Sequence, residues 1–304
     1  MKFFILKVVI TGQSQEVEQW EANLNPGSML FRGSLRSKIY VDKSGLIEKI
    51  NELVCTEQKY VCVSRPRRFG KSMAANMLAA YYKKDEDTRP LFDKLLISQS
   101  ESYEEHLNQY DVIRINMQQF LSETHNMEEM LSKLRNYLIM DLQEAYEKIR
   151  FREKTSLVQT MKDVFAYTGC PFIILIDEWD CLFREYQKDK EAQKKYLDFL
   201  RAWLKDQDYV GLAYMTGILP IKKYGSHSAL NMFIEYSMTD PGDVAQYFGF
   251  TEEEVDALCQ EYGMSLKKQK PGTMVMGYGH IAVRVISFYS SIVPKSGSRS
   301  YAAS

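Results

Sequence analysis

Apolar residues in this chain form short continuous runs, separated by longer segments with helical spacing. The continuous runs predict strands buried on both faces, at 60–64, 110–117, 171–177, 209–217 and 231–238. The segments that favour helices lie at 46–54, 72–84, 127–149 and 194–206. Because the strands alternate with helices, the pattern predicts an α/β fold with a parallel sheet flanked by helices.

The pattern changes near residue 240. The segment "DPGDVAQYFGFTEEEVDALCQEYGM" predicts two short helices, the second opened by Thr251 as N-cap with acidic residues in its first turn. Beyond Tyr262 there is no aspartate or glutamate, while serine and glycine become frequent. We therefore expect an N-terminal arm (1–26), a main domain (27–239), a small helical lid segment (240–264) and a divergent tail (265–304).

Composition excludes several classes of protein. Hydrophobic residues make up 45% of the 304 residues, and the formal charge of −1 gives no global attraction to nucleic acid or to an anionic membrane. Five cysteines without C-x-x-C spacing and four histidines argue against a zinc site or a disulfide framework, and favour a reducing cytoplasm. The apolar N-terminus resembles a signal peptide, but Lys7 interrupts it and no clean cleavage site follows. No apolar run reaches the length of a membrane span.

The turn between the strand at 60–64 and the helix at 72–84 predicts a phosphate-binding loop. It matches G-x-x-x-x-G-K-[ST], except that Arg65 stands at the first glycine. Backbone N–H groups and the helix N-terminus would hold phosphate, Lys71 would reach the β- and γ-phosphates, and Ser72 would ligate Mg²⁺. An incidental Gly-Lys-Ser turn is the alternative. The residues expected to contact the nucleotide are Arg65, Pro66, Arg67, Arg68, Phe69, Gly70, Lys71, Ser72 and Met73.

The run "FIILIDEWD" supplies the acidic residues that such a loop needs for hydrolysis. Asp177 would lie at the carboxyl edge of the sheet and hold Mg²⁺ together with Ser72, while Glu178 would polarise the attacking water. Trp179 and Asp180 have no such role and are expected in a solvated loop. Thr216, at the end of "AYMTG", would act as a sensor of the γ-phosphate, or else as an ordinary strand cap.

Four motifs in order resemble the bacterial AAA-ATPase-like family over about residues 22–264. They are "IYVDKSGLIE", "SRPRRFGKSMAANML", "IILIDEWD" and "TGILPIKKYGSHSALN". The resemblance implies a P-loop NTPase of the additional-strand, catalytic-glutamate (ASCE/AAA-like) type, in which an arginine at position 65 is usual. It matches Asp177 and Glu178 to the Walker B acids, and it places Tyr40 and Asp42 near the adenine. Arg184 and Arg201 are only candidates for an arginine finger.

Family members usually continue with an aromatic-rich segment and a PD-(D/E)XK nuclease-like domain, which the tail after Met264 does not match. We therefore expect a frameshift or a truncated gene model, which would explain the loss of acidic residues there. The alternative is a genuine divergent tail in which "HIAVRVISFYSSIV" forms an edge strand. Nuclease activity is not expected of this chain, because the residues for it would lie in the domain that does not follow.

The sequence therefore predicts an ATP-binding, Mg²⁺-dependent ATPase with Lys71, Glu178 and Thr216 as catalytic residues. The alternative is a nucleotide-dependent regulatory switch with little or no hydrolysis. A homo-oligomer is expected by analogy with ATPases that share an arginine between subunits, and nucleic acid is a partner by family association only.

Overall fold

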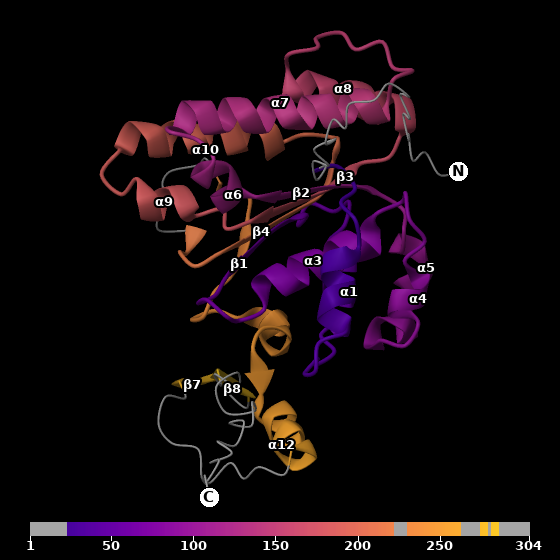
Figure 1. Cartoon of the computed structure of the whole chain (residues 1–304), viewed down its shortest axis with the longest axis vertical. Helices are drawn as coiled ribbons and strands as arrows, with labels where there is room; N and C mark the ends of the chain where they lie inside the picture. The colour runs from indigo at the N-terminus through magenta and orange to yellow at the C-terminus, as the bar shows by residue number, and fades with distance from the viewer. Residues whose placement is uncertain (1–22, 222–229, 263–273, 279–280, 286–304) are drawn as a thin grey trace, which may run out of the picture.

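The computed structural model describes residues 23–221, 230–262, 274–278 and 281–285. At its centre lies a parallel sheet of five strands (Figure 1). In spatial order these are β2 (Asp111–Asn116), β3 (Phe172–Asp177), β4 (Val210–Gly217), β1 (Tyr60–Ser64) and β5 (Ile234–Tyr236). All five correspond to the apolar runs, so the predicted parallel sheet is confirmed.

Helices cover both faces of this sheet, as its two-sided burial requires (Figure 1). In β3, Ile174 and Ile176 pack towards one helical layer, and Ile173 and Leu175 pack towards the other. The first layer contains α6 (Met117–Ser122), α7 (Met127–Ala145), α8 (Leu157–Thr168), α9 (Cys181–Glu185) and α10 (Lys190–Leu204). The second contains α1 (Met29–Leu35), α2 (Gly45–Asn51), α3 (Lys71–Tyr82), α4 (Arg89–Phe92), η1 (Leu96–Gln99), α5 (Tyr103–His106) and η3 (Gly242–Tyr247).

The strand order brings distant parts of the sequence to one edge of the sheet. β4 lies between β1 and β3, and it is the additional strand expected of this class of P-loop fold. Ser64 at the end of β1 pairs with Gly217 at the end of β4, and Ile176 of β3 pairs with Met215. The carboxyl ends of the three strands therefore lie side by side, where ligands bind in open α/β sheets.

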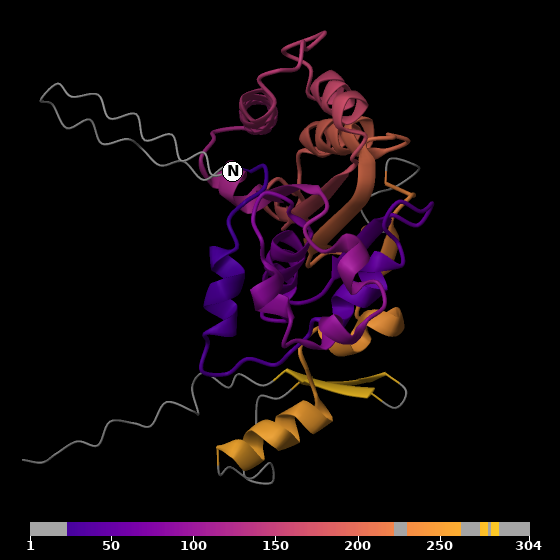
Figure 2. The same ribbon diagram turned by 90° about the vertical axis from the view of Figure 1, so that its right-hand side faces the viewer.

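The lid segment contains η3, β6 (Phe250–Thr251) and α12 (Glu252–Glu261). Thr251 forms the expected N-cap as part of a capping box, accepting from the N–H of Glu254 while the Glu254 carboxylate accepts from the N–H of Thr251. α12 lies next to a small antiparallel sheet in the order β6-β8-β7, with β7 at Met274–Tyr278 and β8 at Ile281–Val285 (Figure 2). The strand expected in the tail is thus central in its sheet, and the prediction of an edge strand was wrong.

The ends of the chain lie largely outside the described residues. Where the description begins, Leu24 is buried and forms an antiparallel bridge with Ile113 of β2, so residues 23–25 pack on the main sheet. Most of the tail after Met264 is not described, and the frameshift hypothesis stays a prediction. Among the helices in the described ranges, none is both long and apolar enough to cross a bilayer.

Candidate functional site

The loop between β1 and α3 has the backbone of an anion-binding turn. Gly70 has a φ of 81°, a left-handed conformation that favours glycine, and α3 begins at the next residue, Lys71. Arg68 is also left-handed, with a φ of 70°. The N–H of Arg65 donates to the carbonyl of Gly217 at 3.0 Å, which fixes the start of the loop against β4. The N-terminus of a twelve-residue helix therefore opens at the edge where the strands end.

Arg65, which replaces the first glycine of the motif, turns its side chain away from this opening. It is only 3% exposed, and its guanidinium donates to the carbonyl of Ser237 and lies 5.9 Å from the ring centre of Phe248. Arg67 and Arg68, in contrast, are exposed. We expected the Arg65 guanidinium beside the phosphates, but it contacts the segment after β5. A contact between Arg65 and the nucleotide stays a prediction.

Lys71 lies inside the loop. Its ammonium donates to the carbonyls of Arg65 at 2.9 Å and Pro66 at 3.0 Å, so it occupies the concavity that the loop forms. Burial lowers the pKa of Lys71, and the carboxylates of Glu178 and Asp177 oppose that effect. A lysine held among loop carbonyls can transfer to an anion that enters the same space, because its partners are exchangeable neutral acceptors.

Asp177 and Thr216 meet across β3 and β4. The Thr216 hydroxyl and the N–H of Glu178 both donate to Asp177 Oδ1, the second at 3.1 Å. Asp177 Oδ2 is buried and has no hydrogen-bond partner within the described part of the chain. An oriented carboxylate with one unsatisfied oxygen fits Mg²⁺, which prefers oxygen ligands and retains waters. Ser72, the other expected ligand, is exposed on the first turn of α3.

Glu178 occupies a strained position directly after β3. Its φ of 57° is unusual for a residue with a side chain, and such strain is found mainly at functional sites. Its carboxylate forms an ion pair with Arg184 of α9, and this pairing was not foreseen from the sequence. Arg184 Nε also lies 3.4 Å from Asp180 Oδ2. Arg201, the other finger candidate, is exposed on α10.

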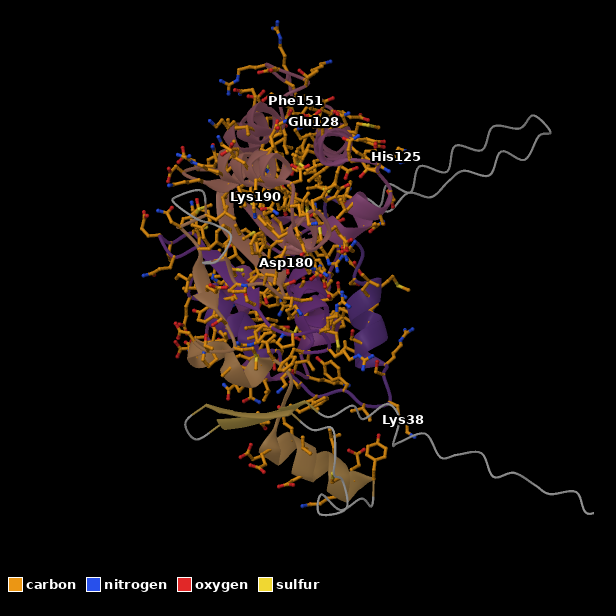
Figure 3. All side chains as sticks on the ribbon, turned by 90° about the vertical axis from the view of Figure 1, so that its left-hand side faces the viewer. Lys38, His125, Glu128, Phe151, Asp180 and Lys190 are labelled. Carbon is orange, nitrogen blue, oxygen red and sulfur yellow. The ribbon has the colours of Figure 1, made fainter. Side chains whose placement is uncertain are left out.

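Trp179 and Asp180 are both fully buried, so the prediction that they lie in a solvated loop was wrong. Asp180 lies in the interior of the molecule (Figure 3), where its Oδ2 accepts from the N–H groups of Ile218 at 3.1 Å and Leu219 at 2.9 Å. The carbonyl of Trp179 accepts from the buried hydroxyl of Tyr196 at 2.7 Å. These hydrogen bonds anchor the turn that carries Glu178, although Trp179 Nε1 and Asp180 Oδ1 are buried without a hydrogen-bond partner in the described part of the chain.

Tyr40 and Asp42 lie in the segment at 38–43, which packs against the lid segment. Both Asp42 oxygens are used locally, by the N–H groups of Ser44 at 2.8 Å and Leu96 at 2.7 Å. Burial, with a smaller contribution from Asp42, raises the pKa of Tyr40 above its usual range. Tyr40 packs against the core on the α3 side of the sheet. Their contact with adenine stays a prediction.

Further contacts join the lid segment to the phosphate loop and to the segment at 38–43. Lys43 donates to the carbonyl of Gln246 at 2.6 Å and pairs with the Glu254 carboxylate. The N–H of Gly249 donates to the carbonyl of Phe69 at 3.1 Å, inside the phosphate loop. Lys38, seen beside α12 in Figure 3, lies over the ring of Tyr262. The lid segment therefore contacts both the phosphate loop and the segment at 38–43.

Comparisons with known proteins agree with this geometry. A protein of Azotobacter chroococcum mcd 1, described as "Uncharacterized protein in vnfD 5'region", is 25% identical over 224 residues, or 72% of this chain. The chain spans only 41% of the length of that relative. The model of the AAA-ATPase-like family, described as "Predicted AAA-ATPase", matches residues 34–226, which include the phosphate loop, the acidic strand end and Thr216. Since that match covers more than half of the 304 residues, the chain belongs to the AAA-ATPase-like family.

Proposed function

We propose that this protein binds ATP with Mg²⁺ and hydrolyses it at the carboxyl edge of the sheet. The observation that carries the proposal is the convergence of three elements from distant parts of the chain. The phosphate loop, Asp177 with its unpartnered oxygen, and Thr216 lie at the ends of β1, β3 and β4. The unpartnered oxygen supports the proposal, because a buried carboxylate oxygen without a hydrogen-bond donor is suited to a metal ion.

Each residue has a distinct role in the proposed reaction. The loop N–H groups and the Lys71 ammonium hold the phosphates, and Lys71 exchanges its carbonyl partners for them. Mg²⁺, held by Asp177 and Ser72, would neutralise charge on the phosphate oxygens. Thr216 keeps the Asp177 carboxylate in place. Glu178 orients the attacking water and accepts its proton.

The test is steady-state ATP turnover by the full chain and by Glu178→Gln. We expect the variant to lose at least about a hundredfold in turnover while still binding ATP, because the amide cannot accept the proton. Glu185→Gln, an exposed change on α9, is the matched control and should leave turnover unchanged. Wild-type turnover that survives Glu178→Gln would refute the assigned role.

A nucleotide-dependent switch with slow hydrolysis is the second candidate, and a specific observation favours it. Lys71 is held by loop carbonyls and Glu178 is held by Arg184, so both catalytic side chains are engaged in the same conformation. ATP binding without turnover by the wild type, in the presence of Mg²⁺, would support this reading. Adding duplex DNA to the same assay tests the association with nucleic acid, and sedimentation of the nucleotide-bound protein tests the proposed homo-oligomer.

A further inference from the structure

Arg184 lies between two carboxylates that differ in burial, Glu178 with 22% of its side chain exposed and Asp180 with none. Its side chain is 17% exposed, one end of the guanidinium pairs with Glu178, and Nε lies 3.4 Å from Asp180. Asp180 is fully buried and is fixed by the N–H groups of Ile218 and Leu219. Asp180 is therefore the fixed neighbour of the arginine, whereas Glu178, whose side chain is 22% exposed, is the partner that Arg184 can release.

The pairing of Arg184 with Glu178 conflicts with the chemistry proposed for Glu178. A carboxylate oxygen that accepts from a guanidinium is occupied and cannot accept from an attacking water at the same time. Glu178 follows Asp177 directly at the end of β3, so the guanidinium that pairs with Glu178 lies at the same edge of the sheet as the phosphate loop. A polyphosphate bound at this edge would compete with Glu178 for the guanidinium.

We propose that Arg184 holds Glu178 in the nucleotide-free protein and exchanges it for the terminal phosphate of ATP. In the nucleotide-free protein the pair keeps Glu178 inactive. When ATP binds, the third phosphate attracts the guanidinium, which pivots about Asp180 and releases Glu178 towards water. ADP lacks that phosphate and leaves the pair intact. This inference rests on the proposed function, since it assumes that the loop binds ATP.

The exchange makes Glu178 a competitor of ATP for the same arginine. Removing the Glu178 charge should therefore tighten ATP binding, but only while Arg184 is present to respond. An ion pair that merely holds α9 in place predicts no such dependence. Nucleotide affinity thus separates the two roles without relying on turnover.

The experiment is a double-mutant cycle on the full chain, measured by calorimetric titration with Mg²⁺ and either ADP or a non-hydrolysable ATP analogue. Glu178→Gln should tighten binding of the analogue about tenfold and leave ADP binding unchanged. Arg184→Gln should weaken binding of the analogue about tenfold or more, again without a change for ADP. In the Arg184→Gln background, Glu178→Gln should have no further effect. Arg184→Lys, which keeps the charge, should restore part of the preference for the analogue.

The outcomes distinguish the failure of each proposal. Equal weakening of analogue and ADP by Arg184→Gln would show a structural ion pair and overturn the exchange. An effect of Glu178→Gln that is the same with and without Arg184 would overturn it as well. Binding of neither nucleotide by the wild type would refute the proposed function and, with it, this inference. Unchanged ADP binding by each variant serves as the control for correct folding.

Discussion

Gly217, the last residue of β4, lies directly against the indole of Trp179. A Cβ added at Gly217 would come within 2.6 Å of Trp179 Nε1 and 2.8 Å of Asp180 Oδ1. Both neighbours are fully buried, so neither can move aside into solvent. The turn that carries Glu178 therefore packs against Gly217 so closely that no side chain larger than hydrogen fits there.

Gly217→Ala should destabilise the protein by about 1–3 kcal/mol, because the added methyl group must displace a packed tryptophan. Urea denaturation followed by fluorescence would measure the change in free energy of unfolding. Gly33→Ala is the control, since a Cβ there meets nothing within 4 Å and lies in the interior of α1. It should stabilise by up to about 1 kcal/mol. Equal effects of the two changes would contradict the packing described here.

Thr216→Val removes the hydroxyl that orients Asp177 while keeping the shape of the side chain. We expect turnover to fall about 10–100-fold with a small change in KM, together with a loss of stability of about 1 kcal/mol. Thr216→Ser keeps the hydroxyl and should retain most of the activity. A loss of stability without a loss of turnover would instead identify Thr216 as an ordinary strand cap.

Arg65→Ala should destabilise the protein by about 2–3 kcal/mol, because it removes a buried charged donor and leaves the Ser237 carbonyl without it. The exposed Arg67 lies two residues away, and Arg67→Ala should change stability by less than about 0.5 kcal/mol. Thermal unfolding of both variants provides the comparison. Similar small shifts for the two would show that the Arg65 side chain is not tied to the segment after β5.

The burial of His106 should make the free energy of unfolding depend on pH. The ring is nearly buried and shares a hydrogen bond of 2.8 Å with Tyr110, and burial lowers its pKa below the ordinary value of 6.5. The unfolded chain therefore takes up the proton first, and stability is lost as the pH falls from 6.5 towards the lower pKa of the folded state. Below that pKa the loss is complete. His106→Gln should remove this component from the urea midpoints, whereas the exposed His125→Gln should not.

The strands could be predicted because each is apolar along its whole length, which is typical of a sheet covered on both faces. The helix α8 was not expected, although its signal is present in the sequence. Ser156 caps it by accepting from the N–H of Gln159, and Leu157, Met161 and Val164 recur at helical spacing on its buried side. An N-cap residue before a weakly amphipathic segment is the sequence signal that predicts such a helix.

Some residues of the candidate site could likewise be placed from the sequence, and others could not. The positions of Lys71, Asp177 and Thr216 at the sheet edge could be predicted, because a motif or the end of an apolar run gives them, while their roles stay predictions. The partners of Arg65 and Arg184 could not. Ser237 lies 172 residues from Arg65, and the pairing of Arg184 depends on the left-handed turn at Glu178. Trp179 and Asp180 are polar or amphipathic in sequence, and their burial depends on the missing side chain of Gly217 and on the N–H groups of Ile218 and Leu219.

The ion pair between Lys43 and Glu254 joins residues 211 positions apart, and this has a consequence for synthesis of the protein. Contacts of such long separation must close a long loop of chain, and they form late in folding. The phosphate loop and the acidic strand end emerge from the ribosome well before Glu254 does. A nascent chain would therefore hold the phosphate loop and the acidic strand end before this ion pair can form, and translation that stops before residue 254 would leave Lys43 without its carboxylate partner.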